Sequence, residues 1–154
     1  MQRSSIPEPS RLYSLKPEGI GTSEVESLAS YAMRLSEAHF IDVCVLIYRF
    51  VYPLTQQAWK DVRLRGRTYK AGPHRITHAH LYIDKWLGME EEAKATVAAL
   101  SELTKRDDLH LLTTLPLETY FLPHSVLKPR KSWCPCCYED QRARGRPVWG
   151  LLLG

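Results

Sequence analysis

The sequence lacks several features that mark whole classes of protein. No apolar run approaches the roughly 20 residues that span a bilayer, and the opening "MQRSSIPEPS" has no hydrophobic stretch of the secretory kind. There is no G-x-S-x-G, Gly-rich phosphate-binding loop or H-E-x-x-H pattern, and no internal repeat of the solenoid kind. These absences favour a cytoplasmic protein that is not an enzyme and has no membrane partner.

Cysteine is scarce and unevenly placed. Of the four cysteines, Cys44 stands alone in an apolar stretch, whereas Cys134, Cys136 and Cys137 crowd into four positions. This crowding suits a metal site better than a disulfide framework.

The sequence does contain enough hydrophobic residues for a core. They make up 44% of its 154 residues, which suffices for one ordinary core, or for a small core with a metal-stapled module. We expect a mainly α fold, with a helix-turn-helix-like domain followed by a zinc-ribbon-like C-terminal element. The expected divisions are a loose arm over 1–10, the helix-turn-helix-like domain over 11–75, a helical segment over 76–122 and a partial zinc-ribbon element over 123–154.

The first sixty residues predict three closely spaced helices. In "TSEVESLASYAMRLSEAHF", Ser23 and Glu26 have capping-box spacing, and apolar residues recur at helical intervals. The apolar "VCVLIYRFV" follows Asp42 as its N-cap and is expected to stop at Pro53. Thr55 is placed to cap a third helix, "QQAWKD". Three short helices followed by arginines favour a helix-turn-helix unit, although a plain helical core gives the same pattern.

The second half of the chain predicts two more helical segments. An amphipathic helix is expected over about 90–105, and the leucine-rich "DLHLLTTLPLETYFL" predicts a short packed helix broken at Pro116. His39, at the end of the first predicted helix, is expected to be a packed or capping residue rather than a general base. From Pro123 onward the composition becomes basic, aromatic and rich in cysteine. That change marks the expected start of the C-terminal element.

Basic residues concentrate in two stretches, although the net charge is only +4. Residues 60–75 carry six basic side chains against Asp61, and residues 124–154 carry six against Glu139 and Asp140. Such stretches supply salt-sensitive affinity for nucleic-acid backbones, but a solvated charged surface has the same composition.

A C-x-x-C pair in "CPCC" matches half of a four-ligand zinc site. A tight turn would let Cys134 and Cys137 point at one zinc ion, with sulfur–metal distances of about 2.3 Å, and Cys136 is an alternative ligand or a bystander. Redox chemistry uses the same spacing, normally at a helix start in a βαβ setting that this sequence lacks. The H-x-H pair of His78 and His80 could complete the site, but ligands beyond the last residue are the favoured explanation.

Two elements of the sequence together resemble a known family. "ESLASYAMRLSEAH" is similar to the E-S-L-x-S-Y/W-x-x-R-L-A-x-A-H element of the TniQ transposition target-selection proteins, and "WCPCCYED" is similar to their W-C-P-x-C-Y zinc element. With "EEEAKATVAALSELTKRDDLHLLTTLP" between them, the resemblance covers about residues 10–150 and is nearest to the small TniQ proteins of type V-K CRISPR-associated transposons. The order and spacing of the two elements make the pair specific.

The resemblance implies a non-enzymatic adaptor with a helix-turn-helix domain and zinc-ribbon elements. Such proteins link a target-recognition complex, which in type V-K systems is an RNA-guided effector with its guide RNA, to the AAA+ ATPase TnsC. Zinc is the implied cofactor, held by Cys134 and Cys137. In the family further ligands come from a later C-P-x-H element, which the resemblance places after the last residue of this sequence. The alternative is a free-standing helix-turn-helix or zinc-containing DNA-binding selector of target sites. The residues implied to contact nucleic-acid backbone are Lys60, Arg63, Arg65, Arg67, Lys70, Lys128, Arg130, Lys131, Arg142 and Arg144.

Overall fold

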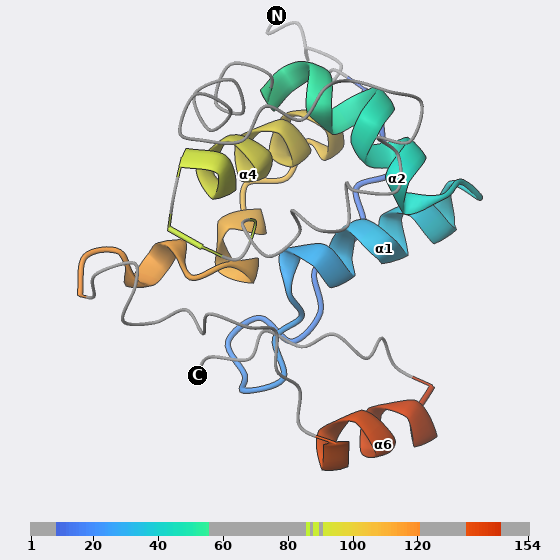
Figure 1. Cartoon of the computed structure of the whole chain (residues 1–154), viewed down its shortest axis with the longest axis vertical. Helices are drawn as coiled ribbons and strands as arrows, with labels where there is room; N and C mark the ends of the chain where they lie inside the picture. Colours follow the sequence, from blue (N-terminus) through green and yellow to red (C-terminus); the bar gives the residue numbers. More distant parts are fainter. Residues whose placement is uncertain (1–8, 56–85, 87, 90, 121–134, 146–154) are drawn as a thin grey trace, which may run out of the picture.

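The computed structural model describes residues 9–55, 86, 88–89, 91–120 and 135–145. These residues are mainly helical, as the sequence predicts, and none of them forms a strand. Figure 1 shows the arrangement of the helices. The elements in chain order are α1 (Leu28–Ala38), α2 (Val43–Leu46), the π-helical η1 (Ile47–Val51), α4 (Glu91–Thr104), the 3₁₀ turns η3 (Leu109–Leu112) and η4 (Leu115–Leu117), and α6 (Pro135–Ala143).

The start of α1 differs from the sequence prediction. Its N-cap is Ser27, whose Oγ accepts the Ser30 backbone N–H at 3.2 Å. The predicted capping box of Ser23 and Glu26 is therefore wrong. Glu26 instead pairs with an earlier segment: its N–H donates to the Glu18 carbonyl at 3.1 Å, and its carboxylate accepts the Glu18 N–H at 2.8 Å. This pairing, across the turns of residues 18–24, keeps Glu26 outside the helix, which begins at Leu28.

The end of α1 places a phenylalanine in the left-handed backbone region. The Ile41 N–H donates to the Ser36 carbonyl and the Phe40 N–H to the Glu37 carbonyl, both at 3.0 Å. These are the two bonds of a Schellman motif, whose left-handed residue is usually glycine. Here that residue is Phe40, with φ +54°. A side chain other than hydrogen is strained in this conformation, because its Cβ approaches the following carbonyl oxygen.

The second helical stretch begins as predicted but does not end as predicted. The Asp42 carboxylate accepts the backbone N–H two residues later at 2.7 Å, which confirms this N-cap. The helix continues over 43–55, so the stop predicted at Pro53 is wrong. In η1 the Tyr52 N–H donates to the Ile47 carbonyl, five residues back. This wide π turn leaves room for the ring of Pro53, whose missing N–H and bulk would break a regular α-helix.

Thr55 lies inside this same helix. Its hydroxyl donates to the Val51 and Tyr52 carbonyls at 3.3 Å each, so it does not begin a new helix as the sequence predicted. The expected third helix, "QQAWKD", falls outside the described residues, as do the divisions at residues 75 and 122. Between α1 and residues 43–55 the chain bends by 101°. A helix-turn-helix unit has a similar angle, but its presence here stays a prediction.

The amphipathic helix expected over 90–105 is confirmed by α4. Like α1 it ends in a strained left-handed residue: Lys105 has φ +54°, and the Arg106 N–H donates to the Ser101 carbonyl at 3.2 Å. The leucine-rich segment after it forms η3 and η4. Pro116 lies within η4, where the fixed φ of proline suits a first turn, so the predicted break at this residue is wrong.

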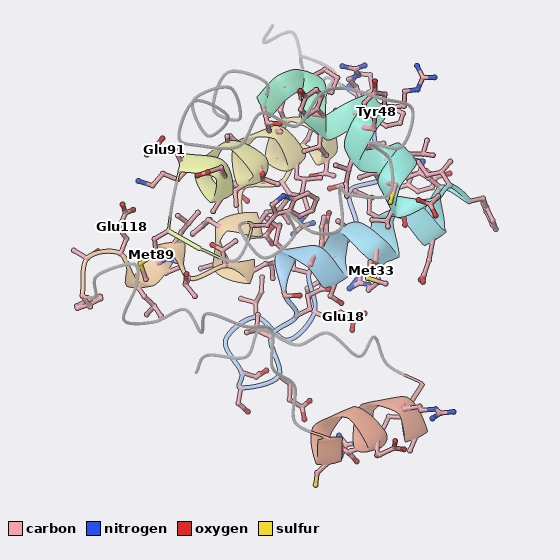
Figure 2. All side chains as sticks on the ribbon, viewed as in Figure 1. Glu18, Met33, Tyr48, Met89, Glu91 and Glu118 are labelled. Carbon is pink, nitrogen blue, oxygen red and sulfur yellow. The ribbon has the colours of Figure 1, made fainter. Side chains whose placement is uncertain are left out.

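The core lies between α1, residues 46–51, α4 and η3, where the side chains of these elements meet (Figure 2). The N-terminal segment crosses it, since the Leu12 N–H donates to the Leu103 carbonyl at 2.9 Å. Each fully buried aliphatic or aromatic side chain contributes about 1.5–3 kcal/mol through loss of water contact. The buried residues of this cluster are Leu12, Leu28, Tyr31, Ala32, Leu35, Leu46, Ile47, Val51, Trp86, Ala99, Leu100, Leu103, Leu109 and Leu112.

Within the described ranges, no single helix is both long and apolar enough to cross a membrane. The bent pair formed by α1 and residues 43–55 passes the same length and composition test only when the two parts are joined.

Candidate functional site

The zinc-ribbon prediction rests largely on residues outside the described ranges. Cys134 lies outside them, Cys136 is an exposed free cysteine, and Cys137 lies in the first turn of α6. The helix begins at Pro135, a residue favoured at the first helical position. In the part of the chain that the structure describes, no group of three or more His, Cys, Asp and Glu residues could hold a metal ion. Zinc binding by Cys134 and Cys137 stays a prediction.

Most residues predicted to contact nucleic acid also lie outside the described ranges. Two are described, Arg142 in α6 and Arg144 just after it, and both are exposed. The Arg144 guanidinium lies 2.8 Å from Asp140 and 3.8 Å from Glu24. A phosphate would therefore compete with two carboxylates for Arg144. Nucleic-acid contact by the predicted residues within 60–70 and 128–131 stays a prediction.

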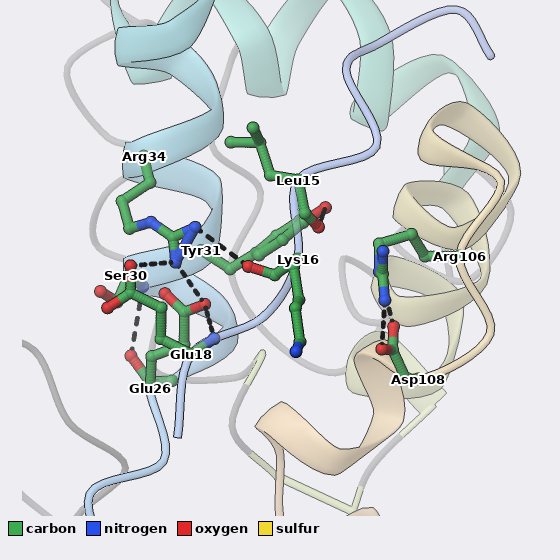
Figure 3. A network of polar contacts seen from close by, with 10 residues as sticks. Leu15, Lys16, Glu18, Glu26, Ser30, Tyr31, Arg34, Arg106 and Asp108 are labelled. Atoms are coloured by element: carbon green, nitrogen blue, oxygen red, sulfur yellow. Dashed lines mark hydrogen bonds and ion pairs between the residues drawn. The ribbon is translucent and has the colours of Figure 1, made fainter. Parts of the chain in front are cut away.

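The family-like element "ESLASYAMRLSEAH" forms α1 with both of its caps, and its arginine is the centre of a polar cluster (Figure 3). Arg34 Nη1 lies 2.8 Å from Glu26 Oε1 and 3.0 Å from Glu18 Oε1. Its Nη2 donates to the Lys16 carbonyl at 3.1 Å. The guanidinium thus joins helix α1 to the segment that precedes it, and the fork of an arginine suits this because it donates in several directions at once.

Burial shapes the ionisation of this cluster. Glu26 is only 5% exposed, and burial raises its pKa, against the opposing effects of the Glu18 N–H and the Arg34 guanidinium. Its second carboxylate oxygen, Oε2, has no hydrogen-bond partner among the described residues. The Glu18 N–H and the Arg34 guanidinium together make a buried carboxylate tolerable here.

Two other residues of the same element hold the same N-terminal segment. The Tyr31 hydroxyl donates to the Leu15 carbonyl at 3.1 Å. His39 Nε2 accepts the Tyr13 N–H at 3.0 Å, and the two rings stack with their centroids 4.2 Å apart. The expectation that His39 is a packed or capping residue is confirmed, since it is also the C-cap of α1. The polar residues of the element therefore clamp residues 13–18 onto the helix, a structural role.

A separate ion pair fixes the turn after α4. Arg106 Nε donates to Asp108 Oδ1 at 2.8 Å, and its Nη2 contacts the other carboxylate oxygen. These bonds lower the pKa of Asp108.

The Cys44 thiol lies elsewhere, at the start of α2, where burial and the neighbouring Asp42 raise its pKa. A nucleophilic cysteine requires a lowered pKa, so this thiol has no such activation.

The feature that sequence reasoning missed is Phe40. Its side chain is 96% exposed, the most exposed of the large apolar side chains in the described residues, although its backbone is strained. A signal was available in the sequence: no glycine stands between the end of the amphipathic pattern and the N-cap Asp42. An aromatic residue there must occupy the position that glycine usually fills.

Neither protein-family models nor curated protein sequences gave a match to this chain. The resemblance to the TniQ family therefore rests on its two sequence elements.

Proposed function

We propose that this chain is a TniQ-like, non-enzymatic adaptor of RNA-guided DNA transposition. It would bridge an RNA-guided effector with its guide RNA to the AAA+ regulator TnsC and so direct insertion of the transposon. The observation that carries the proposal is the presence of the two family-like elements in order, at residues 26–39 and 133–140. The geometry of the first element supports it, because its glutamate, tyrosine, arginine and histidine each have a defined structural task.

The distribution of charge also supports an adaptor with two kinds of partner. Residues 60–75 carry six basic side chains against one acidic one, and residues 124–154 carry six against two. Residues 89–108, which include α4, instead carry six acidic side chains against three basic ones. Nucleic-acid phosphates would be attracted to the two basic stretches and repelled by the acidic stretch around α4. The acidic stretch is then the part suited to meet a protein.

Zinc fits this proposal as a structural cofactor. Cys137 lies in the first turn of α6, three positions after Cys134. Cys134 and Cys137 would supply two of four ligands, and the metal would stabilise the fold of the C-terminal element. The protein would act in the cytoplasm, where transposon DNA and the effector complex meet.

The direct test is co-sedimentation of the purified protein with TnsC filaments formed on DNA with an ATP analogue. The proposal predicts that the protein enters the pellet with the filament and not with DNA alone. Its absence from the pellet in both samples would refute the adaptor function.

The second candidate is a free-standing DNA-binding selector of target sites. The 101° bend between α1 and the following helix favours it, because helix-turn-helix pairs meet at such angles. Against it, the second helix begins with Asp42, a carboxylate that would face the phosphates at the end that normally reads the major groove. Tight, sequence-selective binding to bare duplex, without TnsC or guide RNA, would support this alternative.

A further inference from the structure

Phe40 is strained in its backbone, and burial of its ring within the described residues does not offset that strain. Its ring is 96% exposed, so it gains almost nothing from burial, while its left-handed backbone conformation disfavours any residue with a Cβ. An exposed, strained aromatic side chain is explained when its ring is buried by another molecule. Strained residues of this kind are found at binding sites more often than elsewhere.

The backbone around Phe40 is held rigidly. Its own N–H and that of Ile41 close the end of α1 with 3.0 Å bonds, and His39 beside it stacks on Tyr13. The next residues cap α2 through Asp42, so the turn is fixed at both ends. The ring therefore projects from a corner between two helices. An anchor presented this way loses little conformational freedom on binding, which is the main advantage of a preformed docking residue.

The charges beside Phe40 select the kind of partner. Glu37 and Asp42 flank it in sequence and are both exposed. A nucleic acid or an anionic membrane would be repelled at this corner. A protein pocket that is apolar inside and basic at its rim would be complementary, since buried aromatic anchors with a charged rim are the common arrangement of protein interfaces.

We infer that Phe40 is the anchor of a protein-docking surface and enters an apolar pocket with a basic rim on the AAA+ regulator. The stacked Tyr13 and His39 rings extend this surface on the side of α1. The choice of the AAA+ regulator rests on the proposed function, whereas the pocket chemistry rests on Phe40 and its acidic neighbours.

The test uses two glycine substitutions at matching positions. Phe40→Gly and Lys105→Gly each remove a side chain from the left-handed residue that ends a helix. Both variants should melt at a higher temperature than wild type, because glycine relieves the backbone strain. Phe40→Gly should bind TnsC filaments about thirtyfold more weakly, the effect expected of an aromatic anchor. Lys105→Gly should bind as wild type does, and Phe40→Trp should retain most of the affinity.

The outcomes separate this inference from the proposed function. If the wild-type protein binds TnsC and Phe40→Gly binds it with the same affinity, the docking role is overturned and the adaptor function is retained. Loss of guide-RNA or DNA binding in Phe40→Gly, with TnsC binding unchanged, would identify a nucleic-acid contact instead and also overturns it. If the wild-type protein does not bind TnsC at all, the proposed function fails and the docking inference fails with it.

Discussion

Replacement of Arg34 by methionine tests the structural role assigned to the family-like element. Methionine keeps most of the apolar stem but removes the guanidinium that contacts Glu26, Glu18 and the Lys16 carbonyl. Removing one partner of a buried ion pair costs about 3–5 kcal/mol. Arg34 is itself 17% exposed and Glu18 about half exposed, so the Glu18 contact adds little. We therefore expect the variant to lose about 2–3 kcal/mol of unfolding free energy at pH 7.

The loss can be measured by urea denaturation followed by circular dichroism. Arg49→Met is the matched control, because Arg49 is exposed and its replacement should change the free energy by less than about 0.5 kcal/mol. The double variant Glu26→Gln with Arg34→Met should recover part of the loss, since it leaves no buried charge without a partner. An Arg34→Met variant as stable as the Arg49→Met control would refute the assignment of a structural clamp.

Three further predictions concern titration and metal binding. Burial raises the pKa of Glu26 above its ordinary value of 4.5, so the folded protein keeps this proton to higher pH than the unfolded chain does. The free energy of unfolding should therefore fall as pH rises from 4.5 through the raised pKa. Glu26→Gln should remove this pH dependence, measured by urea denaturation at a series of pH values. The hydrogen bond from Arg106 lowers the pKa of Asp108 below 3.8, so the ionised carboxylate should stabilise the fold above pH 3.8 and this stabilisation should be lost as pH falls through the lowered pKa. In Asp108→Asn the free energy of unfolding should therefore fall less steeply at acid pH. Replacing Cys134 and Cys137 together by serine should abolish bound zinc, measured by mass spectrometry of metals. The helical circular dichroism signal of α1 and α4 should persist. Unchanged zinc content in that variant would remove both cysteines as ligands.

Local patterns in the sequence were reliable where neighbouring residues decide the structure. The amphipathic period of α4 and the Asp42 N-cap were predicted correctly, because helical periodicity and a side-chain cap involve residues only a few positions apart. The π turn at residues 47–51 was not predicted from Pro53, although proline does not fit a regular α-helical turn. The choice between stopping the helix and widening it depends on the core, where Ile47 and Val51 are buried.

The sequence by itself determined that this chain is mainly helical and which helix faces are apolar. It also placed the ten basic residues and the C-x-x-C pair on which the proposed function depends. Only the tertiary structure decided where α1 begins, because Glu26 pairs with residues that lie eight positions earlier instead of capping its own helix. Likewise, only the fold showed that Phe40 projects into solvent from a strained turn. The start of α1 depends on a pairing with a separate segment, which helical periodicity does not contain. The absence of a glycine before Asp42 indicates the strained turn, but the exposure of the Phe40 ring depends on how the neighbouring elements pack.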